Sequence, residues 1–154
     1  SLSKTYCMTG WRLAWVIGNR GAVGALTRLK DHIDSGQFNA IQETAAFCLK
    51  EHDRLAPPIR ETFLTRAKLF IRLLEKAGWR VFAPVATFFI WARPPAELRS
   101  LACVYRLLSE ASVLCTPGSG FGPAGEGYVR FSLTAPERRI KEAAQRIARI
   151  NWHY

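Results

Sequence analysis

One cation lies inside a short apolar stretch near the end of the chain. Arg130 stands within residues 128–133, Tyr-Val-Arg-Phe-Ser-Leu, which alternate in the manner of a strand. An unpaired guanidinium is costly to bury, so we expect Arg130 to be paired with an anion. The residues alone leave open whether that anion is Glu126 or another carboxylate.

The first twelve residues carry a hydroxyl, an amine and a guanidinium, those of Ser1, Lys4 and Arg12. Each has an ordinary explanation when it is taken by itself. A lone lysine is usually a solvated surface cation with a pKa of about 10.4. Ser1 is then a chain end, and Arg12 is a charge at the edge of a strand. Only a wider pattern can give these three residues a shared role.

Two other patterns do not support a site. The loop of residues 117–127 contains G-x-G-x-x-G from Gly120 to Gly125, but it includes Pro123 and leads into a strand, so no helix N-terminus follows to hold a pyrophosphate. The histidines and cysteines lack the spacings typical of zinc ligands or catalytic triads, and we expect no metal site; they are His32, His52, His153, Cys7, Cys48, Cys103 and Cys115.

Composition excludes disorder and collagen-like repetition. The 154 residues are 49% hydrophobic and 22% charged, which is enough to bury the core of about one domain. The net charge of +10 suits a polyanion, a membrane surface or a phosphate-bearing small molecule. However, the arginines are scattered without a block of like charges, which is typical of solvated helix faces.

The cysteines and the apolar runs bear on location. Three of the four cysteines sit among apolar neighbours, so we interpret them as reduced thiols of an intracellular, cytoplasmic protein. Arg80, Pro84, Arg93 and Pro94 interrupt the most hydrophobic stretch, so no membrane span is expected.

Hydrophobic periodicity predicts an order of elements. The longest helix is expected from Pro57 to Gly78, with Gly78 at positive φ after its end. A capping box is expected from Thr134 to Glu137, before a last helix that turns Ile140, Ala144 and Ile147 inward. The other predictions are strands at 11–17, 79–83, 87–92, 112–115 and 128–133, and helices at 22–33, from 41 onward, and at 96–110.

The opening residues resemble the cofactor-lysine motif of class I and II aminotransferases. In that motif S-x-S-K is followed by G-W-R, whose arginine stands eight residues past the lysine, as in Ser1-Leu-Ser-Lys4 and Gly10-Trp-Arg12. Further segments also resemble the family in order along the chain, at residues 35–42, 86–91, 117–122 and 125–133. The detail is most similar to the aspartate, alanine and LL-diaminopimelate branch.

The resemblance implies the α/β fold of pyridoxal 5'-phosphate (PLP) dependent transferases, fold type I. It implies that residues 1–56 are the C-terminal remainder of the large PLP-binding domain, and that 57–154 are the connecting helix and a small α+β domain. The family residues that lie before the lysine fall outside this chain, so we expect the chain alone to be inactive or nearly so. Cys7 and Ala14 depart from the family's usual Asn and Gly.

The resemblance also implies roles. Lys4 would form the Schiff base with PLP and move the proton, Ser1 and Arg12 would bind the cofactor phosphate, and Arg130 would bind the substrate α-carboxylate. The implied substrates are an amino acid and a 2-oxo acid, and the intact protein is expected to be a homodimer. Asn19 and Gln42 are explained by turn capping and a helix surface.

Three other functions remain open at this point. An aminotransferase-like sensor domain of a transcription regulator would need a winged-helix segment upstream. A PLP lyase of the same fold, such as a relative of aminocyclopropane-carboxylate synthase, would differ in its product. A basic nucleic-acid-binding module predicts salt-dependent affinity, but scattered arginines without an aromatic stacking platform argue against it.

Overall fold

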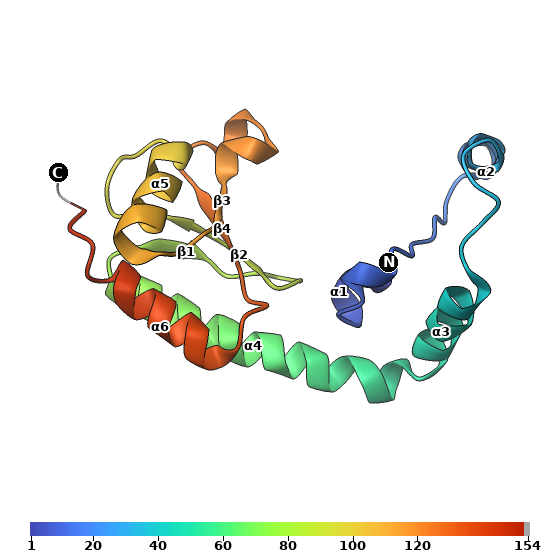
Figure 1. Cartoon of the computed structure of the whole chain (residues 1–154), viewed down its shortest axis with the longest axis horizontal. Helices are drawn as coiled ribbons and strands as arrows, with labels where there is room; N and C mark the ends of the chain where they lie inside the picture. The colour runs from blue at the N-terminus through green and yellow to red at the C-terminus, as the bar shows by residue number, and fades with distance from the viewer. Residues whose placement is uncertain (153–154) are drawn as a thin grey trace. The chain divides into compact units, whose positions relative to one another are not determined.

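The computed structural model describes residues 1–152, and this part of the chain divides into two compact units. The first is Ser1–Arg60 and the second begins at Glu61. Figure 1 shows helices in the first unit and a sheet with helices in the second. Each unit is described by itself.

The first unit is helical and has a small core. Its elements are α1 (Leu2–Thr5), the 3-10 helix η1 (Thr9–Trp11), α2 (Arg20–Asp31) and α3 (Asn39–Lys50). The buried side chains are Leu2, Tyr6, Ala45 and Cys48, with Met8, Leu13, Leu55 and Ala56 packed against them. The core therefore joins α1 to α3 and to the residues near His52.

The strand predicted at residues 11–17 is wrong. Trp11 ends η1, and Arg12 adopts the left-handed conformation with φ 52°, which interrupts an extended chain. Within residues 1–152, no strand pairs with residues 13–17, and an unpaired extended segment has no ladder to stabilise it. Trp15 and Ile17 are exposed.

The apolar face predicted for α2 is present but not buried. Leu29 is 58% exposed, and Ile33, which lies two residues beyond the end of the helix, is 70% exposed. The helix begins at Arg20, two residues earlier than predicted, because the Asn19 side chain caps it by accepting from the backbone N–H groups of Gly21 and Ala22.

The longest helix is α4, and it begins earlier than predicted. It runs from His52 to Lys76, with Pro57 and Pro58 inside it. In its first turn, the Glu51 carbonyl accepts hydrogen bonds from the N–H groups of Arg54 and Leu55. The helix therefore begins before the two prolines.

The end of α4 is as predicted. Gly78 has φ 81°, and the N–H of Trp79 bonds to the carbonyl of Leu74 while the N–H of Gly78 bonds to that of Glu75. This pair of hydrogen bonds is the Schellman motif, which requires the left-handed conformation that glycine adopts without steric cost.

The second unit is built on an antiparallel sheet. Its strands are β1 (Arg80–Phe82), β2 (Phe89–Arg93), β3 (Thr116–Pro117) and β4 (Val129–Ser132), in the order β1-β2-β4-β3. The strands predicted at 79–83, 87–92 and 128–133 are confirmed. The one predicted at 112–115 is wrong, because Ser112 caps the preceding helix in the left-handed conformation and pairing with β4 starts at Thr116.

One face of the sheet forms the core. Ile90 and Ala92 of β2 alternate with outward residues and lie opposite Phe131 and Val129 of β4. Helices α4, α5 (Ser100–Ala111) and α6 (Glu137–Ile147) lie beside the sheet (Figure 1), and all three contribute side chains to this core. Helix α5 begins four residues later than predicted, because Arg99 is still extended.

Helix α6 confirms the predicted inward face but not the capping box. Ile140, Ala144 and Ile147 are buried. The N-cap is Pro136, with no side-chain cap bond, so the helix starts two residues too late for Thr134 to cap it. The Thr134 hydroxyl instead lies 3.1 Å from the hydroxyl of Ser132.

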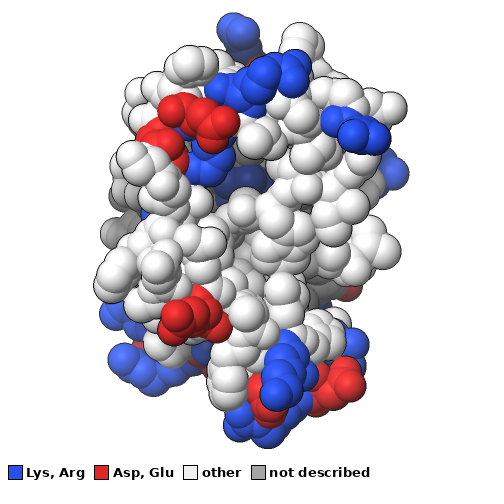
Figure 2. Space-filling view, turned by 90° about the vertical axis from the view of Figure 1, so that its right-hand side faces the viewer, with Lys and Arg blue, Asp and Glu red and all other residues white. Residues whose placement is uncertain are grey.

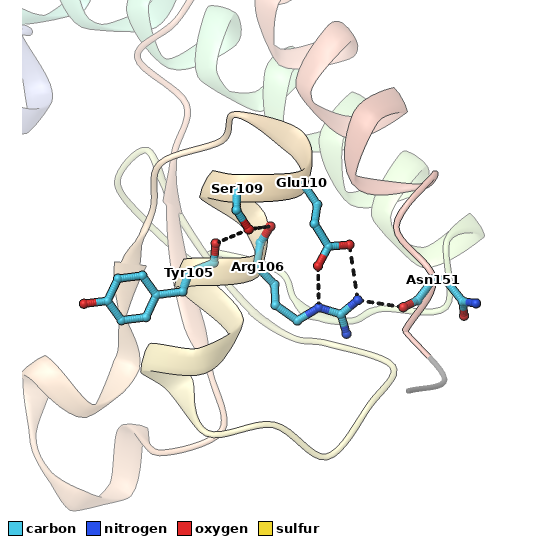
Figure 3. Close-up of polar contacts among 5 residues, drawn as sticks. All are labelled: Tyr105, Arg106, Ser109, Glu110 and Asn151. Carbon is cyan, nitrogen blue, oxygen red and sulfur yellow. Dashed lines mark hydrogen bonds and ion pairs between the residues drawn. The ribbon is translucent and has the colours of Figure 1, made fainter.

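The segment after α6 is bound to α5 through the side chain of Arg106. The Arg106 guanidinium binds both carboxylate oxygens of Glu110, at 2.7 and 3.2 Å, and donates to the Asn151 carbonyl at 2.7 Å (Figure 3). Its Cζ also lies 5.1 Å from the centre of a Trp152 ring, and Trp152 packs edge-on against Trp79. Arg106 thereby holds residues 151–152 against the core.

Candidate active site

The face of the sheet that is turned away from the core carries one row of side chains across all four strands. The pairing register places Phe82 opposite Trp91, Trp91 opposite Arg130, and Arg130 opposite Thr116. Neighbours in such a row have Cβ atoms about 4.5–5.5 Å apart, so they form one surface. This face borders a cleft of about 740 Å³. Among the described residues that line the cleft, Arg130 is the only charged one.

Arg130 is surrounded by rings instead of carboxylates. Its Cζ lies 4.0 Å from the centre of the Phe89 ring and 4.2 Å from that of Phe121. Its Nε is shielded from solvent and has no hydrogen-bond partner within the described chain. No carboxylate in residues 1–152 forms an ion pair with it. Within residues 1–152, the cation that the sequence predicted to need an anion has no carboxylate partner.

The alternative partner, Glu126, is engaged elsewhere. Its Oε1 accepts from the backbone N–H of Ser100 at 2.6 Å and from that of Gly127 at 3.1 Å. The Ser100 hydrogen bond, followed by that of Gly127, holds the pKa of this carboxyl below its usual value. The structure therefore contradicts the alternative in which Glu126 is the anionic partner of Arg130.

The glycine-rich loop is folded tightly beside the cleft. It forms η2 (Gly118–Phe121) and η3 (Pro123–Gly125) and then enters β4, as predicted. A Cβ on Gly118 would lie 2.1 Å from the Gly125 carbonyl oxygen, so glycine is required for this close approach. The buried Ser100 hydroxyl donates to the Gly125 carbonyl and accepts from the Gly127 N–H. These contacts fix the segment that carries Phe121.

Ser1, Lys4 and Arg12 all lie in the first unit. Ser1 is the N-cap of α1, Lys4 is on that helix, and Arg12 follows η1; all three are exposed. Two hydrogen bonds connect the elements: Arg12 Nη1 donates to the Thr9 carbonyl at 2.8 Å, and the Thr9 hydroxyl donates to the Ser3 carbonyl at 3.1 Å. The structure thus ties the turn bearing Arg12 to the helix bearing Lys4.

The donor set of the first unit fits the implied cofactor. A hydroxyl and a guanidinium are hydrogen-bond donors suited to a phosphate, and a primary amine reacts with an aldehyde. Exposure leaves the side chains of Ser1, Lys4 and Arg12 accessible to such a group. The helix that carries Lys4 is fixed by Tyr6, whose hydroxyl lies 2.8 Å from His52 Nδ1.

Sequence reasoning missed the residues that surround the predicted ones. Phe89 and Phe121 lie inside segments that resemble the family, at 86–91 and 117–122, but no role was assigned to them, and Ser100 lies outside those segments. Alternation along 89–93 places Phe89 and Trp91 on one face, and this signal was available. The contact of Phe121 with Arg130 depends on the folded loop and has no local signal.

Two features are absent from residues 1–152. No group of three or more His, Cys, Asp or Glu side chains is arranged to hold a metal ion, and His153 lies outside the described residues. None of the helices in this part of the chain combines the length and the apolar character that crossing a membrane requires. On the face drawn in Figure 2, Lys and Arg lie in separate groups among acidic and uncharged side chains.

Comparisons with known proteins cover nearly the whole chain. The family model described as aminotransferase class I and II matches residues 1–147. The LL-diaminopimelate aminotransferase of Aquifex aeolicus is 43% identical over 150 residues, which are 97% of this chain and 39% of the relative. The chain thus spans about two fifths of the length of that relative.

Solved structures agree with this assignment. An aminotransferase from Staphylococcus aureus matches with a TM-score of 0.89 at 32% identity, over 96% of this chain and 39% of that one. A probable N-succinyldiaminopimelate aminotransferase from Thermus thermophilus matches with a TM-score of 0.87 at 33% identity, over 96% of this chain and 40% of that one. The expected α/β fold of the PLP-dependent transferases, fold type I, is therefore confirmed. With its opening lysine motif, its glycine loop and its sheet all within the matched range, the chain belongs to the aminotransferase class I and II family.

Proposed function

We propose that this chain is part of a PLP-dependent aminotransferase that moves an amino group between an amino acid and a 2-oxo acid. The observation that carries the proposal is the family match over residues 1–147, which includes Ser1, Lys4, Arg12 and Arg130. In this proposal residues 1–56 belong to the large PLP-binding domain, and 57–154 are the connecting helix and small domain.

The first unit would hold the cofactor. The Ser1 hydroxyl and the Arg12 guanidinium would bind its phosphate, the second through charge-assisted hydrogen bonds. Bound PLP supplies an aldehyde for amines and an electron-withdrawing ring. The Lys4 amine would attach covalently to the cofactor and, once released, would hold and move the proton at the substrate α-carbon.

The second unit would hold the substrate. Arg130 has no carboxylate partner within residues 1–152, and it is the only charged residue among the described ones that line the cleft. The α-carboxylate common to amino acids and 2-oxo acids is an anion of the required shape, since it can accept two parallel hydrogen bonds from a guanidinium.

Assembly, location and donor are further parts of the proposal. A homodimer and a cytoplasmic location are expected of the intact protein. Because the Aquifex relative is named for LL-diaminopimelate, a diamino dicarboxylic acid is the first amino donor to assay. The relatives reported above are all described as aminotransferases, which gives no support to a regulator or a lyase.

Two measurements test the proposal. In the protein that carries this chain, Lys4→Ala should abolish transamination, while the exposed Lys50→Ala on α3 should retain it. Reduction of the PLP-treated protein with borohydride, followed by peptide mass spectrometry, should place the adduct on Lys4. Turnover that survives Lys4→Ala, or an adduct spread evenly over several lysines, would remove Lys4 from this role.

A further inference from the structure

Two aromatic rings cover the guanidinium of Arg130. Their centres lie 4.0 Å (Phe89) and 4.2 Å (Phe121) from its Cζ, which is stacking distance for a planar cation. At this separation one face of the group has room for one ring only. Phe89 and Phe121 therefore flank the guanidinium and limit the directions from which a ligand can approach it.

The Nε edge of the guanidinium is closed. Nε is shielded from solvent and has no partner within the described chain, so the packing that surrounds it also keeps a ligand from reaching it. The terminal NH2 groups, Nη1 and Nη2, are the donors that remain. They present parallel N–H bonds at the end of the side chain, which match the two oxygens of a carboxylate.

We propose that Phe89 and Phe121 are positioning residues, which hold Arg130 so that a substrate carboxylate binds end-on to its two terminal nitrogens. The inference rests on the proposed function for the identity of the ligand. It goes beyond that function in naming the two rings and the edge of the cation that is used.

Simple core packing does not account for Phe121. Phe121 is 50% exposed, so burial does not explain why an aromatic residue stands here. It is nevertheless held in place, because it packs edge-on against Trp91 at 5.3 Å between centres and ends the η2 turn fixed by Gly118. Phe89 comes from β2 and contacts Phe88 at 4.7 Å. A strand and the folded glycine-rich loop thus supply the two rings.

Steady-state kinetics of the protein that carries this chain provides the first test. Phe121→Leu frees the guanidinium to rotate, and ordering such a side chain again on binding raises KM by about three- to tenfold. The increase should be equal for the amino acid and the 2-oxo acid, with kcat nearly unchanged. Phe121→Tyr keeps the ring and should restore both KM values.

The control is another phenylalanine that stacks on an arginine. Phe63 lies 5.6 Å from Arg66 Cζ and does not line the cleft, so Phe63→Leu should leave both KM values unchanged. If Phe121→Leu leaves both KM values at the wild-type level, or if Phe63→Leu raises them equally, the positioning role is overturned.

A second readout does not depend on catalysis. In nitrogen-detected NMR of the chain, ring currents should shift the Arg130 guanidinium protons upfield, and Phe121→Leu should remove much of that shift. Added sodium acetate should perturb the terminal NH2 signals and leave Nε–H nearly unmoved. A wild-type Arg130 without the upfield shift, or acetate binding at Nε–H, would overturn the inference. Absence of transamination together with the expected NMR result would reject only the proposed function.

Discussion

Glu126 Oε1 lies 2.6 Å from the backbone nitrogen of Ser100 and accepts its hydrogen. This contact places a carboxylate at the first turn of α5, where the N–H groups have no partners within the helix. Because Glu126 belongs to the glycine-rich loop, the same bond ties that loop to α5. It explains why Glu126 is not the partner of Arg130.

This bond predicts a specific dependence of stability on pH. The folded state lowers the pKa of Glu126 below its usual value of 4.5, so the stabilisation is complete above that pH and is lost as the pH falls through the folded-state pKa. Glu126→Gln should therefore lower Tm near pH 7 and have a much smaller effect near pH 3. Thermal unfolding at the two pH values measures this, with the exposed Glu97→Gln as background. An equal loss of Tm at both would contradict it.

Two glycines of the same loop should respond differently to a methyl group. Gly118→Ala places a Cβ 2.1 Å from the Gly125 oxygen and 2.7 Å from that of Tyr128, so the loop must move and the free energy of unfolding should fall by about 1–3 kcal/mol. A Cβ on Gly120 would have no atom within 4 Å, so Gly120→Ala should change the free energy of unfolding little. Urea denaturation distinguishes the two; equal effects would show that the loop is not tightly packed.

The four thiols should differ in reactivity. Burial raises the pKa of Cys103 and of Cys115 to about 12, and Cys48 is also buried, whereas Cys7 is exposed. Because the thiolate is the reactive form, a disulfide reagent at pH 8 should modify Cys7 in the native chain much faster than the others. In Cys7→Ser the fast phase should disappear. A fast phase that persists there would mean that the core opens readily.

Arg106 should contribute more to stability than an arginine on the surface. Arg106→Lys loses the paired contact with Glu110 and the bond to the Asn151 carbonyl, so the free energy of unfolding should fall by about 1–2 kcal/mol. Hydrogen exchange near residue 152 should rise with it. Arg138→Lys, in a pair whose arginine is 77% exposed, should cost less than about 0.5 kcal/mol. Equal losses would show that Arg106 does not fasten the C-terminal segment.

Local patterns in the sequence determined much of the second unit. Ile140, Ala144 and Ile147 repeat at helical spacing and are buried together in α6. Gly78 ends α4 at positive φ, as a glycine after a helix predicts. The alternation that predicted the strand at 128–133 also placed Arg130 on the face away from Val129 and Phe131. These features depend on neighbours within about one turn or one pleat, so the order of residue types is enough to predict them.

The strand predicted at 11–17 failed for the opposite reason. Large apolar side chains are typical of buried strands, but a strand forms only where another strand pairs with it, and pairing is a long-range property. The predicted capping box at Thr134 is wrong because the start of a helix depends on the backbone conformation, which the residue types at positions 134–137 do not determine.

The sequence by itself determined the family, through the spacing of Ser1, Lys4 and Arg12 and the residues around Arg130. Only the tertiary structure decided what surrounds Arg130. Phe89 comes from β2 and Phe121 comes from the loop, whereas Glu126 is hydrogen-bonded to the backbone at the start of α5. The physical reason is that stacking on a cation and capping of a helix join residues from separate elements, and their proximity is created by folding.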